Sequence, residues 1–147
     1  MPFRFALAPI LRLRQSIERQ RTLQLQEANL HVSRAQQEVA QLDRFLINTD
    51  QSDSAALAAG CCAAELQFVV SLRRNLMAYR EELLSDVRRL ELLRQKALGE
   101  YHQAYRDREI LESLRARQRH TYQQEQSRRQ QQELDATHLL QRWHGRS

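Results

Sequence analysis

Apolar residues recur along the second half of the chain with an unbroken spacing of seven. The column consists of Val69, Leu76, Leu83, Leu90, Ala97, Ala104 and Leu111. A seven-residue repeat with no internal proline predicts one long helix that lies against a partner helix. Such a helix makes contacts along a rod and is poorly suited to enclosing a reaction, so we expect a protein that is not an enzyme.

The first part of the chain carries a second apolar seam, in steps of three and four residues. It begins with Ile10, Leu13 and Ile17 and continues through Leu25, Ala28, Val32, Ala35, Val39, Leu42 and Leu46. The gap between Ile17 and Leu25 is two steps of four, which predicts a stutter that locally relaxes the supercoil. Pro9 suits the first turn of a helix, so we predict a helix over about residues 9–47.

Capping and turn-forming residues interrupt the pattern at residues 48–54. We place the turn region at about residues 48–61 and a second helix at about residues 62–140. The sequence leaves open whether residues 54–59 form a short helix or begin the second one.

One turn between two long helices predicts an all-α fold. We expect a long two-helix antiparallel coiled-coil hairpin, one domain over residues 1–147, with the second helix overhanging from about residue 115. Folding about this turn sets Pro9 beside Glu100. The same register brings the N-terminal apolar residues to two tyrosines, that is, Phe3, Phe5 and Leu7 to Tyr101 and Tyr105.

The overhang changes character along its length. Residues 115–133 are mainly Arg and Gln and lack a seam, so we expect a lone helix that is frayed or disordered until something binds it. Apolar groups return near the end at Leu134, Ala136, Leu139, Leu140 and Trp143. Trp143 is either a docking anchor or a chance terminal residue.

Positive charge gathers toward both termini. The chain has a formal net charge of +5; residues 1–30 hold 5 Arg against 2 Glu, and residues 115–147 hold 7 Arg against 3 acidic residues. An antiparallel hairpin collects both regions at one end, which orients that end toward an acidic partner. The sequence has no apolar run of the roughly 20 residues needed to span a bilayer and no secretory signal, so we expect no direct membrane insertion.

Residue types that carry chemistry are scattered. The five His residues lack metal-ligand spacing, no Gly-rich phosphate loop is present, and we expect no metal and no cofactor. Cys61 and Cys62 are adjacent and are interpreted as small apolar residues of a cytoplasmic protein. A nucleic-acid binder is disfavoured, because the net charge is modest and no aromatic residue lies between residues 123 and 142.

A second apolar surface is predicted near the turn. Phe68, Leu72 and Tyr79 occur at i, i+4 and i+11, away from the seam, and Leu42 and Phe45 lie near the same end of the first helix. We interpret these five residues as an apolar strip that docks a protein. The alternative is that residues 54–61 fold over the strip.

Three segments resemble the FliJ family of flagellar export stalk proteins. Residues 3–14 are similar to the start of many members, and Ala63–Gln67 is similar to the segment that opens the family's second helix. Arg128–Asp135 loosely matches a late basic-acidic stretch, with glutamines where the family usually has charged residues.

The resemblance implies a non-enzymatic component of flagellar type III protein export, cytoplasmic and peripheral to the inner-membrane export apparatus. Family members form an antiparallel coiled coil resembling the central stalk of rotary ATPases. They enter the hexameric export ATPase ring, promote its assembly and contact the membrane export gate, and some handle empty export chaperones.

On this basis we assign two candidate surfaces. The surface that faces the ATPase consists of Arg12, Arg14, Arg128, Arg129, Gln132 and Asp135. The surface for the second partner, the export gate, is the apolar strip of Leu42, Phe45, Phe68, Leu72 and Tyr79. The rival interpretations are the equivalent stalk of a virulence-type secretion system and a generic coiled-coil scaffold.

Overall fold

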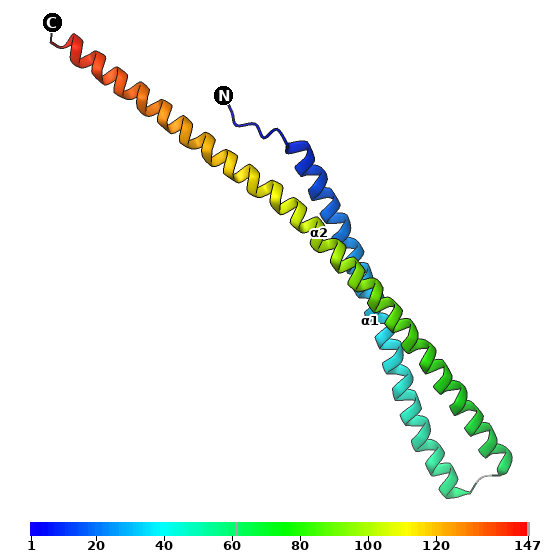
Figure 1. Ribbon diagram of the computed structural model, residues 1–147. Helices are drawn as coiled ribbons and strands as arrows, with labels where there is room; N and C mark the ends of the chain where they lie inside the picture. Colours follow the sequence, from blue (N-terminus) through cyan, green and yellow to red (C-terminus); the bar gives the residue numbers. More distant parts are fainter. Residues whose placement is uncertain (61, 147) are drawn as a thin grey trace. The chain divides into compact units, whose positions relative to one another are not determined.

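The computed structural model describes residues 1–60 and 62–146, and within them it contains two α-helices and no strand. Helix α1 spans Ala8–Ala59 and helix α2 spans Ala63–His144 (Figure 1). The two helices pack against each other, which confirms the prediction of an all-α two-helix hairpin. The chain divides into two compact units, Gln20–His102 and the combination of Met1–Arg19 with Gln103 onward.

Helix α1 ends later than its sequence predicts. Gly60 adopts a positive φ of 90° and its amide donates to the Leu57 carbonyl at 3.2 Å, as is common where glycine terminates a helix. The Cys62 carbonyl then accepts from the Leu66 amide at 3.1 Å as α2 begins. The turn therefore follows Ala59, and our placement of the end of the first helix near Ile47 is wrong.

The residues taken as turn formers are accommodated inside α1. The Thr49 hydroxyl donates to the Phe45 carbonyl at 2.8 Å, one helical turn earlier, and Asp50 forms an ion pair with Arg73 of α2 at 2.9 Å. These contacts satisfy polar side chains that would otherwise favour a turn. Residues 55–59 include four alanines, which have the highest helix propensity and extend the helix to the glycine.

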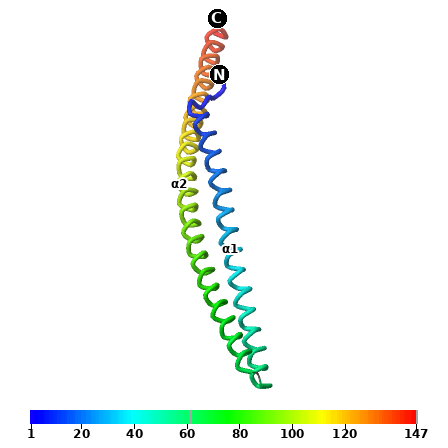
Figure 2. The backbone as a smooth tube through the Cα atoms, turned by 90° about the vertical axis from the view of Figure 1, so that its right-hand side faces the viewer, coloured from blue at the N-terminus to red at the C-terminus, as the bar shows by residue number. Residues whose placement is uncertain are grey.

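In the unit Gln20–His102, the two helices run antiparallel and side by side (Figure 1, Figure 2). Val69, Leu76, Leu90 and Ala97 of the seven-residue column are half-buried and Leu83 is buried. Opposite them on α1, the predicted seam positions are half-buried or buried: Leu25, Ala28, Val32, Ala35, Val39, Leu42 and Leu46. The repeat thus marks the interface between the helices.

The register differs from the predicted one. Arg80 pairs with Asp43 at 2.6 Å, and Glu100 pairs with Arg21 at 2.8 Å rather than lying beside Pro9. The shift follows from the position of the turn, because moving the turn toward the C-terminus brings a later part of α1 opposite each residue of α2.

In the other unit, the start of α1 packs differently from the prediction. Leu11 and Phe5 are buried and Leu7 is half-buried, whereas Ile10 and Leu13 are exposed. Arg14, Ile17 and Glu18 are also half-buried in this unit, so charged residues share the seam with apolar ones. The half-buried Ile17, Arg21 and Leu25 keep the spacing of two steps of four, and the stutter there stays a prediction.

Replacing Leu83 with Ala should lower the free energy of unfolding by about 2 kcal/mol, because it removes apolar contacts from a buried seam position. The change in helical circular dichroism during urea unfolding measures this loss. Leu92→Ala on the same helix is the matched control, since Leu92 is 66% exposed and its replacement should change stability by less than about 0.5 kcal/mol. Equal losses for the two variants would contradict the assignment of the seam.

Candidate protein-interaction surfaces

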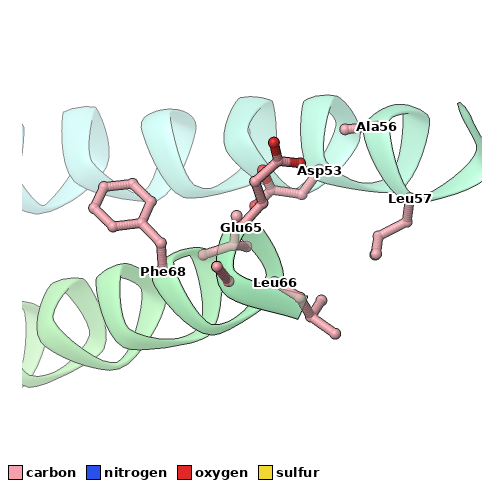
Figure 3. A pocket seen from close by; sticks show the side chains of 8 residues that line it. Asp53, Ala56, Leu57, Glu65, Leu66 and Phe68 are labelled. Atoms are coloured by element: carbon pink, nitrogen blue, oxygen red, sulfur yellow. The ribbon is translucent and has the colours of Figure 1, made fainter. Parts of the chain in front are cut away.

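An open groove lies between the helices beside the turn. Its walls are formed by α1 and by the first turns of α2, and it has a volume of about 510 Å³ (Figure 3). Its lining residues are Asp53, Ala56, Leu57, Ala64, Glu65, Leu66, Phe68 and Val69. We refer to this site as the turn groove.

The groove is open because the seam loses its apolar residues toward the turn. Beyond Leu46 the next seam positions of α1 are Thr49 and Asp53, which are polar and too short to reach across. Figure 1 shows the two helices spreading apart in this region. Leu57 and Leu66 remain exposed on the two sides of the gap.

The five predicted residues of the apolar strip differ in how exposed they are. Phe45, Leu72 and Tyr79 are exposed, and Phe68 is 68% exposed and lines the turn groove. Leu42 is half-buried in the seam and is therefore less accessible than the other four. Residues 54–59 belong to α1 and leave Phe68 and Leu72 uncovered, so the alternative of a covering segment is not seen.

The N-terminal segment packs on α2 in the unit that contains both. The Phe3 ring lies 5.6 Å from that of Tyr122 at an interplanar angle of 46°, and the Tyr122 hydroxyl donates to the Met1 carbonyl. Phe3 thus meets Tyr122 rather than the predicted Tyr101 and Tyr105. Our interpretation of α2 as a lone helix from about residue 115 is therefore wrong up to Tyr122.

A signal for this contact exists in the sequence. Tyr122 continues a second column of α2, at intervals of seven or fourteen, whose other half-buried members are Arg80, Val87, Arg94, Tyr101 and Arg108. Arginines fill several of these positions, so the column does not stand out as apolar. Because charged residues occupy part of this column, its seven-residue spacing is not visible as an apolar pattern, and the contact at Tyr122 was not predicted from it.

An ionic cluster joins α1 to α2 near the N-terminus. Arg108 pairs with Glu18 and with Glu112, and Arg14 pairs with Asp107 at 3.2 Å. The Arg108 and Glu18 side chains are each only 17% exposed. Burial lowers the pKa of Arg108, but hydrogen bonds to Glu112 and Glu18 outweigh it, so the pKa of this guanidinium lies above its ordinary value.

The predicted ATPase-facing residues fall in two environments. Arg12 is exposed on α1, while Arg14 is half-buried and held by Asp107. Arg128, Arg129 and Gln132 are exposed on α2, and Asp135, also exposed, accepts a hydrogen bond from Gln131 at 3.1 Å. Arg14 therefore contributes to the packing of the helices, and the other five remain accessible to a partner.

The C-terminal part of α2 presents an apolar face. Ala136, Leu139, Leu140 and Trp143 follow the spacing i, i+3, i+4 and i+7, which places them on one side of the helix. All four are exposed, and Trp143 is 78% exposed. We refer to residues 136–146, which include Arg142 and Arg146, as the C-terminal segment.

Features typical of metal or membrane sites are absent from the part of the chain that the structure describes. No group of three or more His, Cys, Asp or Glu side chains there is arranged to hold a metal ion. No described helix is both long enough and apolar enough to cross a bilayer. Cys62 is a free, exposed thiol, and Cys61 lies outside the described residues.

Comparison with known proteins gives one match. The family model described as "Flagellar FliJ protein" matches residues 3–147. Neither the curated proteins nor the solved structures contain a match to the chain. The family match covers nearly the whole chain, including both helices.

Replacing Phe68 and Leu72 together with Ala should leave helicity unchanged and alter the free energy of unfolding by less than about 0.5 kcal/mol, because both side chains are exposed. Circular dichroism and urea unfolding measure the two quantities. A large loss of helicity would instead show that these residues belong to the core.

Proposed function

The chain belongs to the flagellar FliJ family, and on that premise we propose that it is the stalk-like component that binds the hexameric export ATPase and links it to the membrane export gate. The family match supports a role in the flagellar export apparatus in preference to the equivalent stalk of a virulence-type system. Family members are non-enzymatic, so the proposed role is to promote the assembly and activity of the ATPase.

The observation that carries the proposal is the division of α2 into two parts. Up to Tyr122 it has contacts with the N-terminal part of the chain, and residues 127–146 are exposed throughout. The exposed part carries Arg128, Arg129, Arg142 and Arg146 against Glu133 and Asp135. Residues 127–133, which precede the apolar face of the C-terminal segment, are polar and include Arg128 and Arg129. A polar stretch of this kind can enter the opening of a protein ring and meet acidic side chains there without a tight apolar grip that would hinder movement.

We assign the second contact to the apolar strip near the turn. The exposed side chains of Phe68, Leu72 and Tyr79 lie on α2, in a different compact unit from Arg128 and Arg129. Exposed aromatic and leucine side chains are typical anchors of protein interfaces. In this proposal the gate binds these residues, the protein works on the cytoplasmic side of the inner membrane, and it also escorts empty export chaperones.

The first test is ATP hydrolysis by the cognate export ATPase, with and without the protein, together with sizing of the ATPase. We expect faster hydrolysis and a shift toward the hexamer. Arg128→Ala/Arg129→Ala should raise the concentration needed for half-maximal stimulation about tenfold, because two charged contacts are lost. Arg88→Ala/Arg89→Ala is the matched control, since this adjacent pair is also exposed on α2.

Two outcomes would contradict the ATPase assignment. If the wild-type protein changes neither hydrolysis nor the oligomeric state of the ATPase, the chain is a scaffold with other partners. If both arginine variants lose stimulation equally, the effect reports general positive charge rather than the assigned surface.

The second test is binding to the cytoplasmic part of the export gate protein. Phe68→Ala/Leu72→Ala should weaken binding about tenfold or more and leave ATPase stimulation unchanged, because the substitutions remove anchors from one surface only. Leu92→Ala/Leu93→Ala is the control, because these leucines are also exposed on α2. Unchanged gate binding by the Phe68/Leu72 variant would refute the assignment of the strip.

A further inference from the structure

The turn groove is lined mainly by apolar side chains. Leu57, Leu66 and Phe68 are exposed around it, and the small side chains of Ala56 and Ala64 leave room between the helices. Two helices that spread apart in this way offer two walls to a third helix, as in other helix-in-groove contacts. The shape and chemistry of the groove therefore suit an amphipathic helix.

The groove is also acidic within a basic protein. From Asn48 to Leu72 the sequence has three carboxylates, Asp50, Asp53 and Glu65, and no Arg, Lys or His. Arg73 pairs with Asp50, and Asp53 and Glu65 both line the groove (Figure 3). An occupant with positive charges beside its apolar face would complement both features.

The C-terminal segment has this combination. Its apolar face is exposed, Arg142 and Arg146 lie beside it in the sequence, and no Asp or Glu side chain follows Asp135 in the given sequence. We propose that the turn groove of one molecule receives the C-terminal segment of a second copy of the chain. Leu139, Leu140 and Trp143 would fill the groove, and the two arginines would face Asp53 and Glu65.

The segment that fills the groove must come from a second copy of the chain, because α2 is one continuous helix. The groove residues Ala64–Val69 and the C-terminal segment belong to one unbroken helix, Ala63–His144. A chain cannot dock the end of this helix on its beginning without breaking the helix. Two copies can use the contact once, head to tail, or twice in a reciprocal dimer. One helical segment in one groove buries little area, so the association should be weak and concentration-dependent.

This contact goes beyond the proposed stalk function and affects it. Phe68 lines the groove and is also assigned to the second partner. The C-terminal segment follows directly on Arg128–Asp135, the stretch assigned to the ATPase. Self-association would therefore cover the proposed gate surface at Phe68 and hinder access to the proposed ATPase surface at Arg128–Asp135. A partner would then bind only after it displaces the second copy.

The test is sedimentation velocity of the full-length protein from low to several hundred micromolar, combined with the emission of Trp143, the single tryptophan. We expect the mass to rise with concentration and the emission to move to shorter wavelength over the same range as Trp143 becomes buried. Asp53→Lys/Glu65→Lys and Arg142→Glu/Arg146→Glu should each weaken association by at least about tenfold, because like charges then meet. An equal mixture of these two variants should associate again, since each supplies the complement of the other.

The matched control for the groove variant is Glu38→Lys/Glu82→Lys, which changes the net charge equally at one exposed position on each helix. This variant should associate like the wild type. A protein that stays monomeric with constant Trp143 emission would overturn the inference, as would association that neither charge reversal weakens or a mixture that fails to associate. ATPase stimulation and gate binding are measured separately from self-association. A result that overturns the self-association proposal would therefore leave the stalk proposal standing.

Discussion

The structure depends on one interaction, the packing of α1 against α2 along a single seam. Two helices that meet on one face bury far less apolar surface than a globular domain of the same length, so each seam position contributes a large share of the stability. The apolar positions of α1 cluster between Leu25 and Leu46, opposite the column from Leu76 to Ala97. In the other unit, Phe5, Leu11 and Ala104 are buried, so that unit has apolar contacts of its own.

Charged residues share the seam with buried apolar residues such as Leu11 where the seam approaches the N-terminus. Arg14, Glu18 and Arg21 occupy seam positions and meet Asp107, Arg108 and Glu100 of α2. Partly buried ion pairs contribute little net stability, because desolvation offsets their attraction, but a wrong register would leave charges unpaired. The ion pairs therefore select one alignment of two helices whose alanines and leucines would tolerate several.

The seven-residue column and the all-α hairpin could be predicted because apolar spacing is a direct consequence of helix packing. The turn could not, because the propensities of residues 48–54 favoured a break that the Thr49 and Asp50 contacts remove, and Gly60 was the effective stop. Tyr122 was missed because arginines share its column. The exposed strip residues on α2 were identified because they deviate from the seam, whereas the ion pair of Arg14 with Asp107 could not be predicted, because it depends on the register of the two helices.

The limits of the seam explain where partners can bind. Toward the turn, Thr49 and Asp53 are polar seam positions and the helices spread into a groove; toward the C-terminus, Phe3 contacts Tyr122, and residues 127–146 are exposed. The contacts between these limits stabilise the hairpin without using the apolar groups at Phe68 and Trp143, which are exposed. Had the seam extended over both regions, the chain would be more stable, but the apolar groups at Phe68 and Trp143 would be buried in it. The exposed apolar groups at the two proposed docking surfaces and the modest stability expected of two helices with one seam are thus consequences of the same distribution of residues.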